Sequence, residues 1–255
     1  MRLIDTHCHL YVEEFDTDLP ATIERAENEG VDRFYLPAID STATTRLLSL
    51  EQRYPGKCFA MMGLHPCSVG ENYASELQQV EEWLSKRTFS AIGEIGLDFY
   101  WDKTFVPQQY DAFRRQLSLA KQYGLPAILH CRDSMNESID TVQALQDGRL
   151  AGIFHCFGGS VEQAQRITGL GFYLGIGGII TYKNAGLGPV LEQLSLDHMV
   201  LETDAPYLSP VPFRGKRNES SYLKYIVQKL AEIKQVPVET VAEITTRNAQ
   251  KIFGV

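Results

Sequence analysis

Short apolar stretches recur along the chain, and each follows turn-forming residues. Their length and their content of branched and aromatic residues are typical of buried strands. About eight stretches read this way: RLIDTHCHL from Arg2, RFYLPAI from Arg33, CFAMMGLHP from Cys58, SAIGEIGLDF from Ser90, LPAILHCR from Leu125, LAGIFHCFGG from Leu150, GFYLGIGGII from Gly171 and DHMVLETDAP from Asp197.

Segments with helical periodicity lie between these strands. In residues 107–123, Tyr110, Phe113 and Leu117 fall on one face. This segment starts with Pro and is followed by Gly124, which are start and stop signals for a helix. The same reasoning predicts helices over 19–29, 42–53, 135–146, 161–168 and 187–194, around Leu77, Val80 and Leu84, and in two closing segments with apolar positions at Tyr222, Ile226, Leu230 and Ile233 and at Val241, Ile244 and Ile252.

This alternation predicts the fold class. About eight strands alternating with helices in 255 residues is the composition of an α/β (β/α)₈ TIM barrel. No linker, internal repeat or low-complexity segment interrupts the pattern, so we expect a single domain over residues 1–255. An open doubly wound sheet is the structural alternative. The barrel makes the sharper prediction that functional residues gather at the C-terminal ends of the strands.

Charge and composition restrict the partners. A formal net charge of -8 argues against a broad basic face that would hold long nucleic acid, although it leaves room for a small local anion site. There is no secretory signal pattern and no apolar run of the ~20 residues that a membrane span needs. We therefore expect a cytoplasmic protein without a membrane partner. Three of the five cysteines neighbour a histidine in a predicted strand and should be buried, reduced and turned away from it.

Most of the histidines lie where the barrel predicts functional residues, at the C-terminal ends of the predicted strands. In a strand, His7 and His9 point the same way and converge on one spot, although a solvated edge strand carries the same pattern by chance. Only His198 falls at the opposite end of a predicted strand, so we interpret it as a structural or surface residue. At the ends of strands one, three, five and six lie His7 and His9, His65, His130 and His155, while Glu94 comes late in strand four and Asp204 ends strand eight.

Several of these side chains form a candidate metal centre. Its predicted ligands are His7, His9, Glu94, His130, His155 and Asp204. Six ligands are more than one tetrahedral ion uses, and mixed nitrogen and oxygen donors suit zinc, manganese, nickel or iron, with magnesium acceptable if water fills several positions. We expect one or two divalent ions per chain, and two ions ~4 Å apart would share a bridging carboxylate, for which Glu94 is the candidate. Asp5, on the face of His7, is a candidate partner for a ligand.

The chain also resembles a known family. DTHCHL, MGLHP, IGEIGLDF, LPAILHCRDS, IFHCF and LETDAPYL resemble, in order and spacing, the TatD-related metal-dependent deoxyribonucleases of the amidohydrolase superfamily. The resemblance extends from residue 4 to RNAQKIF near the C-terminus. It implies a TIM barrel, a divalent metal centre and deoxyribonuclease activity, and it places the metal ligands on the same six residues. The chain departs from the family pattern at Tyr11, Gly158 and Ser220.

Four residues are candidate catalytic groups. Water activated by the metals needs a base, and Asp204 matches the catalytic aspartate of the family. Glu94 would act as the bridge. Glu202 either orients a metal-bound water or a ligand histidine, or pairs with an arginine in the barrel. His65 either donates a hydrogen bond to a phosphate oxygen or leaving group, or stabilises its own loop.

Candidate substrate contacts lie at the same mouth. Arg132 follows His130 by two residues and suits phosphate, unless it pairs with Asp98 or Asp133. Arg214, Lys216 and Arg217 supply positive charge beyond strand eight. The aromatic loop FYWDKTF, residues 99–105, either stacks on bases or packs inside the protein.

Three functions fit these residues. The first is a metal-dependent hydrolase that cleaves phosphodiester bonds of DNA, from single-stranded ends, with short or single-stranded DNA as its partner and no obligate protein partner. The second is an amide, ester or lactone hydrolase on the same centre, which Glu94 disfavours because many amidohydrolases bridge their metals with a carboxylated lysine on strand four. The third is a non-catalytic metal-binding scaffold.

Overall fold

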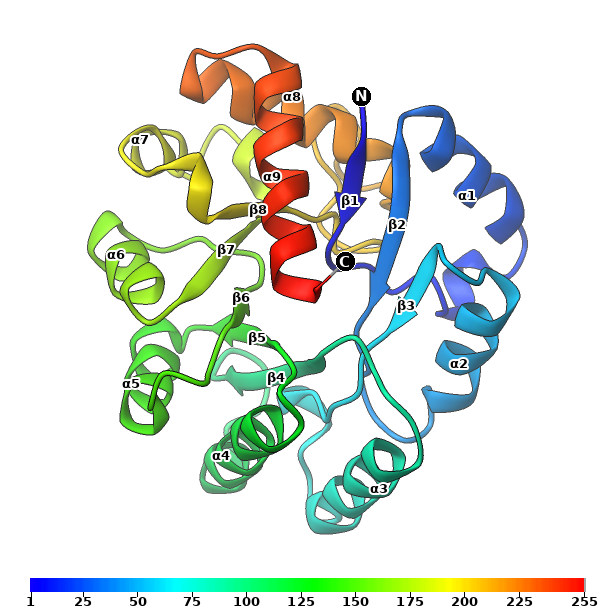
Figure 1. Cartoon of the computed structure of the whole chain (residues 1–255), viewed down its shortest axis with the longest axis vertical. Coiled ribbons are helices and arrows are strands. Elements are labelled where there is room, and N and C mark those ends of the chain that lie inside the picture. Colours follow the sequence, from blue (N-terminus) through cyan, green and yellow to red (C-terminus); the bar gives the residue numbers. More distant parts are fainter. Residues whose placement is uncertain (255) are drawn as a thin grey trace.

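All eight predicted strands form, and they lie parallel to one another around a barrel (Figure 1). The computed structural model describes residues 1–254. Within that range the strands are β1 (Leu3–Asp5), β2 (Val31–Leu36), β3 (Cys58–Ala60), β4 (Ile92–Asp98), β5 (Ala127–Arg132), β6 (Gly152–Phe154), β7 (Phe172–Ile176) and β8 (Met199–Leu201).

The barrel closes through backbone hydrogen bonds between two parallel ladders. One ladder holds β1, β2 and β3, and the other runs from β4 to β8. The Thr6 N–H donates to the Leu201 carbonyl at 3.1 Å, which joins β1 to β8. At the other junction the Gly93 N–H donates to the Met62 carbonyl at 3.0 Å. The strands therefore form the predicted TIM barrel, and the alternative of an open doubly wound sheet is wrong.

Helices surround the strands, as Figure 1 shows. They are α1 (Leu19–Asn28), α2 (Thr44–Arg53), α3 (Tyr73–Lys86), α4 (Val106–Tyr123), α5 (Met135–Leu145), α6 (Val161–Gly169), α7 (Gly188–Glu192), α8 (Leu223–Lys234) and α9 (Val238–Phe253). Short 3₁₀ helices lie at Glu13–Phe15, Pro66–Ser68, Gly178–Thr181, Leu196–His198 and Ser220–Tyr222. The helix α7 is shorter than predicted, and Lys234 Nζ donates to the Leu191, Glu192 and Leu194 carbonyls at its C-terminal end.

The helix α9 covers the amino-terminal end of the barrel. Its Ala249 and Phe253 pack in a cluster with Ile4 and Tyr35, and the rings of Phe253 and Tyr35 stack with centroids 3.6 Å apart. His198 lies exposed beside this end, in the 3₁₀ helix that precedes β8. No helix within residues 1–254 has the length and apolar character needed to cross a membrane.

Several strands end earlier than the sequence pattern suggests. The strand β1 stops at Asp5, so His7 and His9 lie in the segment after it and strand alternation does not orient them. Glu94 is the third residue of β4, which corrects its predicted place late in the strand. The pairing of β4 with β5 shifts register between Ile92 and Ile95, and such a bulge redirects the side chains inside it. Glu94 reaches the site from this bulge.

Candidate metal centre

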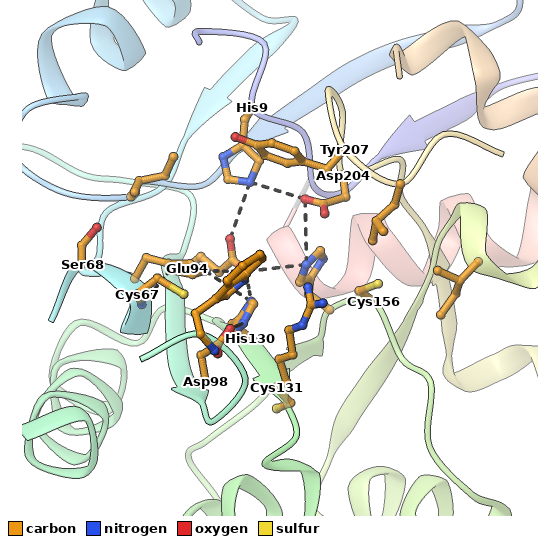
Figure 2. A pocket seen from close by; sticks show the side chains of 17 residues that line it. His9, Cys67, Ser68, Glu94, Asp98, His130, Cys131, Cys156, Asp204 and Tyr207 are labelled. Carbon is orange, nitrogen blue, oxygen red and sulfur yellow. Dashed lines mark hydrogen bonds and ion pairs between the residues drawn. The ribbon is translucent and has the colours of Figure 1, made fainter. Parts of the chain in front are cut away.

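A pocket of about 680 Å³ opens at the carboxyl ends of the strands (Figure 2). This volume lies in the range of small-molecule sites. His7 and Glu202 are fully buried beneath it. The predicted site residues that line the pocket are His9, His65, Glu94, His130, Arg132, His155 and Asp204.

Four acceptor atoms, from His7, His9, Glu94 and Asp204, lie close together in the pocket. His7 Nε2 lies 3.3 Å from His9 Nε2, 3.1 Å from Glu94 Oε2 and 3.5 Å from Asp204 Oδ1. His9 Nε2 lies 3.6 Å from Glu94 Oε2 and 3.5 Å from Asp204 Oδ1. Ligands at the ~2.1 Å typical of zinc would be ~3.4 Å apart along each edge of a tetrahedron. His7, His9 and Glu94 therefore form a group that could hold one divalent cation, and Asp204 Oδ1 lies within 3.5 Å of both histidine nitrogens.

The hydrogen bonds behind His9 show which of its nitrogens carries the proton. The Tyr11 hydroxyl donates to the Pro37 carbonyl at 2.6 Å, and a carbonyl can only accept. His9 Nδ1, 3.1 Å from the same hydroxyl, must then be the donor in that contact. The outward Nε2 of a neutral His9 therefore presents a lone pair, and it faces the other acceptors. Such a cluster of acceptors is unfavourable unless a cation lies among them.

A second, less regular set surrounds the other oxygen of Glu94. Glu94 Oε1 lies 2.8 Å from His130 Nδ1 and 3.6 Å from His155 Nε2. Behind these rings, His130 Nε2 lies 2.9 Å from Asp98 Oδ2, and His155 Nδ1 lies 2.9 Å from Glu202 Oε1. If Asp98 and Glu202 each hold a proton on the ring nitrogen that they face, a neutral ring has its lone pair on the nitrogen that faces Glu94, and a metal ion could bind there in place of the proton that Glu94 otherwise favours. Glu94 is thus placed to bridge two cations.

His65 has the opposite arrangement. Its Nδ1 accepts a hydrogen bond from the Cys67 N–H at 3.0 Å, so in the neutral ring the proton sits on Nε2. That Nε2 points into the pocket, 3.5 Å from Glu94 Oε1 and 3.3 Å from His130 Nδ1. His65 therefore holds its own loop through one nitrogen and offers an N–H donor to the site through the other.

The carboxylates make the centre attractive to cations. Burial disfavours ionised Glu94, but the facing histidines, His7 foremost, outweigh it and hold the pKa of Glu94 well below its usual range. Burial likewise lowers the pKa of His155, but the Glu202, Glu94 and Asp204 carboxylates outweigh it and raise that pKa to about 10. A field that binds a proton this strongly on His155 also favours a metal ion.

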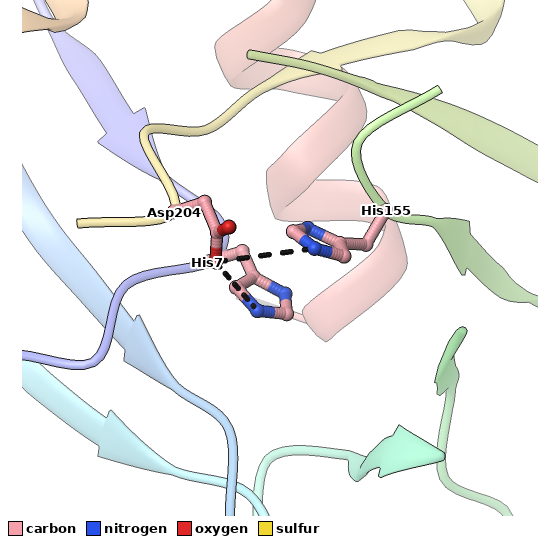
Figure 3. Close-up of side chains that lie close together, drawn as sticks. All are labelled: His7, His155 and Asp204. Atoms are coloured by element: carbon pink, nitrogen blue, oxygen red, sulfur yellow. Dashed lines mark ion pairs between the residues drawn. The ribbon is translucent and has the colours of Figure 1, made fainter. Parts of the chain in front are cut away.

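Asp204 faces both histidine sets (Figure 3). It follows β8 in a left-handed backbone conformation, with φ of 58°, and its N–H donates to the His7 carbonyl at 2.9 Å. Its Oδ1 lies 3.5 Å from His7 Nε2 and 3.9 Å from His155 Nε2. The side chain is 13% exposed, against 3% for Glu94, so Asp204 is the carboxylate of the pair that is more open to the pocket.

Glu202 supports His155 from below. Its side chain is fully buried and does not line the pocket. It accepts a hydrogen bond from the Cys156 N–H at 2.5 Å and faces His155 Nδ1. A Cβ at Gly175 would lie 2.3 Å from Glu202 Oε2, so glycine at this position leaves room for the carboxylate. Of the roles predicted for Glu202, this geometry supports orientation of a ligand histidine.

Asp5 contacts a backbone segment of the site rather than a ligand ring. Its carboxylate accepts from the Thr203 N–H at 2.9 Å and from the Thr203 hydroxyl at 2.6 Å. It also accepts from the His7 N–H at 3.4 Å. The buried carboxyl therefore joins the segment after β1 to the segment after β8, which carry His7 and Asp204.

Arg132 lines the pocket with its charge available. It stacks over the Tyr100 ring, 4.0 Å from its centroid. Within residues 1–254 no acidic side chain lies within ion-pair distance of it, and Asp98 faces His130 instead, at 2.9 Å. The predicted alternative of an internal ion pair with Asp98 or Asp133 is therefore wrong.

The three cationic residues after β8 lie elsewhere. None of Arg214, Lys216 and Arg217 lines the pocket. Arg214 stacks over Tyr182 at 4.1 Å. Arg217 donates two hydrogen bonds to Asp18, at 2.7 and 2.8 Å, so its charge is largely neutralised within the protein.

The cysteines beside the histidines differ from expectation. Cys8 is buried as predicted, but Cys131 and Cys156 are partly exposed and line the pocket. The strand β6 ends at Phe154, and Cys156 follows with φ of 49°, so alternation does not turn it away from the site.

Comparison with known proteins shows the family. A family model described as TatD related DNase matches residues 4–254. The chain belongs to the TatD related DNase family. It is 39% identical to "Uncharacterized metal-dependent hydrolase YabD" of Bacillus subtilis over 99% of both chains, and 32% identical to "3'-5' ssDNA/RNA exonuclease TatD" of Edwardsiella piscicida over 98% of this chain and 99% of that one.

A solved structure supports the same family. The crystal structure of YjjV, a TatD homologue from Escherichia coli K12, superposes with a TM-score of 0.94 at 33% identity, covering 100% of this chain and 98% of the other. These matches confirm the predicted family, the barrel and the prediction of a metal-dependent hydrolase.

Sequence reasoning missed two residues that orient the ligands. The sequence marks Tyr11 only as a departure from the family pattern, yet its hydroxyl contacts His9. Asp98 was considered as a partner for Arg132 but holds His130. For Asp98 a signal existed, because it ends β4, the strand that carries Glu94.

Removal of the Tyr11 hydroxyl should weaken metal binding. In Tyr11→Phe, His9 loses the acceptor that fixes its tautomer, and loss of such a partner typically costs about 10- to 100-fold in metal affinity. Isothermal titration of metal-stripped protein with Zn²⁺ or Mn²⁺ measures the change. Tyr35→Phe, which alters a buried tyrosine away from the pocket, is the control and should bind like the wild type. Unchanged affinity in Tyr11→Phe would mean that the contact does not orient His9.

Proposed function

We propose that the protein is a divalent-metal-dependent exonuclease that removes nucleotides from single-stranded ends of DNA. The observation that carries this proposal is the cluster of acceptor atoms on His7, His9, Glu94 and Asp204, with separations of 3.1 to 3.6 Å from the two histidine nitrogens, beside the second set around Glu94 Oε1. The relative from Edwardsiella piscicida is named a 3'-5' ssDNA/RNA exonuclease, which supports attack from the 3′ end.

Two cations fit this arrangement. His7, His9, Glu94 and Asp204 would hold one, and Glu94, His130 and His155 would hold the other. Nitrogen and oxygen donors in such sets suit zinc or manganese, and magnesium would need additional water ligands. The ions would neutralise phosphate charge and make a bound water acidic near neutral pH.

Two residues of the chain are placed to assist the proton transfers of hydrolysis. Hydrolysis joins a water oxygen to phosphorus and breaks one P–O ester bond, so the attacking water must lose a proton and the leaving oxygen must gain one. Asp204 is ionised, because the neighbouring imidazoles, His155 foremost among them, outweigh burial and lower its pKa, and it is placed to accept the proton of the water. The Nε2–H of His65 is placed to donate a hydrogen bond to the phosphate or to the leaving oxygen.

The charge of the pocket favours a short, flexible substrate. Arg132 is the one lysine or arginine among the described residues that line the pocket. The protein carries a net charge of -8, so most of its surface repels DNA. One guanidinium and the metal centre can hold two or three phosphates. A single-stranded end therefore fits better than the interior of a duplex, which needs an extended basic surface.

A panel of substrates tests this function. Metal-loaded protein is assayed on single-stranded DNA, RNA, a duplex with blunt ends, simple phosphodiesters, lactones and cyclic amides. We expect shortening of single-stranded DNA from one end, with the duplex much slower. Turnover of a lactone or cyclic amide without cleavage of any nucleic acid would favour the amidohydrolase alternative instead. The cytoplasmic location stays a prediction.

A further inference from the structure

Two exposed aromatic side chains border the metal pocket. Trp101 is 68% exposed and Tyr100 is 51% exposed, and Trp101 lines the pocket. Their neighbours in the same loop, Phe99 and Phe105, are partly buried against the core. The loop thus divides into two packing residues and two residues that face solvent, and core packing does not account for the latter.

The backbone of this loop is fixed to the metal centre. Asp98 Oδ1 accepts hydrogen bonds from the Tyr100 N–H at 2.9 Å and the Trp101 N–H at 3.0 Å. Asp98 Oδ2 lies 2.9 Å from His130 Nε2. Gln109 donates to the Asp98 carbonyl at 3.2 Å and accepts from the Asp98 N–H at 2.9 Å. One buried carboxylate therefore sets both the position of Trp101 and the orientation of a candidate metal ligand.

The aromatic pair is also supported from the side. The Arg132 guanidinium lies 4.0 Å from the Tyr100 ring centroid and 5.5 Å from that of Trp101. The two rings meet edge to face, with centroids 4.9 Å apart and planes at 87°. This contact fills the space beside Tyr100, and the indole stays largely open to solvent. An open aromatic surface beside a cation is what a nucleotide needs, since the base can stack while its phosphate is neutralised.

We propose that Trp101, with Tyr100 and Arg132 beside it, forms a subsite that stacks on an unpaired base at the 3′ end of the substrate. This inference rests on the proposed function. Stacking uses the face that every base has, so the subsite tolerates any sequence. A base inside a duplex has both faces covered by its neighbours, and a base at a duplex end is still held by its pair and by stacking on one face, so the subsite favours single strands.

A binding comparison tests the subsite. Two single-stranded oligonucleotides carry a 5′ fluorophore and phosphorothioate linkages that resist cleavage, and one lacks the bases of its two 3′-terminal nucleotides. Both have the same charge. Fluorescence anisotropy should show that the wild type binds the complete strand about tenfold more tightly or better. Trp101→Ala should bind both strands alike, and Trp101→Phe should keep most of the preference.

Two further measurements separate stacking from a structural role. Trp83 and Trp101 are the only tryptophans, and Trp83 lies on α3. The complete strand should therefore quench tryptophan fluorescence in the wild type but not in Trp101→Phe. The control Tyr123→Ala changes an exposed aromatic residue at the end of α4 and should keep the wild-type preference.

The outcomes distinguish the subsite from the proposed function. A wild type that hydrolyses single-stranded DNA but binds the two strands equally overturns the subsite alone. An equal preference in the wild type and Trp101→Ala does the same. A wild type that binds neither strand and cleaves no nucleic acid overturns the proposed function and the subsite with it.

Discussion

Replacement of Asp204 by asparagine should lower kcat by ~10² or more. The amide keeps the shape of the side chain but cannot accept the proton of the attacking water. Glu94, His130 and His155 are untouched, so at least one metal ion should stay bound. Steady-state kinetics on single-stranded DNA, with elemental analysis of the same samples, measures both quantities.

A matched control for this variant is available. Asp197 is exposed near the opposite end of β8, where it pairs with Arg247. Asp197→Asn should therefore keep the wild-type rate and metal content. A near-normal rate in Asp204→Asn would show that another group accepts the proton. Glu202 would then be a poor substitute, because it lies fully buried behind His155.

Glu94→Gln should greatly reduce both metal binding and activity. The two oxygens of Glu94 face different histidine sets, His7 with His9 and His130 with His155. Glutamine replaces one oxygen with an NH₂ group and removes the negative charge, so it cannot bridge two cations. We expect metal content and kcat to fall together, with kcat reduced ~10² or more. Elemental analysis and kinetics on the same preparation measure them.

The control for the bridge is Glu82→Gln, which alters an exposed glutamate on α3. It should keep the metal content and rate of the wild type. Full metal occupancy in Glu94→Gln, with activity lost, would contradict the bridge and leave Glu94 with a purely chemical role.

The barrel was predictable because its signals are local. Each strand is a short apolar run, and each helix has a clear periodicity, as in α4, where Pro107 and Gly124 mark its limits. The neighbours of each strand follow from the order of elements along the chain. Helix ends were less predictable, as α7 shows, because the contact of Lys234 with its last carbonyls joins distant segments.

The sequence also predicted that the candidate ligands lie close together, but part of the reasoning behind that prediction was wrong. Strand alternation was expected to aim His7 and His9, yet β1 ends at Asp5. They converge because the segment after β1 hydrogen-bonds to the segment after β8, where the Asp204 N–H reaches the His7 carbonyl. Glu94 reaches the site through a bulge in β4. Neither feature has a signal in the pattern of apolar residues.

Contacts between side chains that are far apart in the chain could not be predicted from the sequence. The run Arg214, Lys216 and Arg217 looks like an anion site, but Arg217 is paired with Asp18, almost two hundred positions earlier in the chain (|i−j| of 199). The sequence leaves open whether Arg132 pairs with Asp98 or contacts the substrate, because the contact of Asp98 with His130 depends on the fold. The sequence does not distinguish the four aromatic residues of loop 99–105, and only the fold divides them into packed and exposed side chains.

The metal content of three proteins tests the central claim most directly. Wild type, His9→Ala and His198→Ala are purified without chelators and analysed for divalent metals, then assayed on single-stranded DNA before and after metal removal. We predict one or two ions per chain in the wild type and in His198→Ala, with activity that disappears on stripping and returns on re-addition, and loss of metal and activity in His9→Ala. Full activity in thoroughly stripped wild type, or equal metal loss in both variants, would contradict the account.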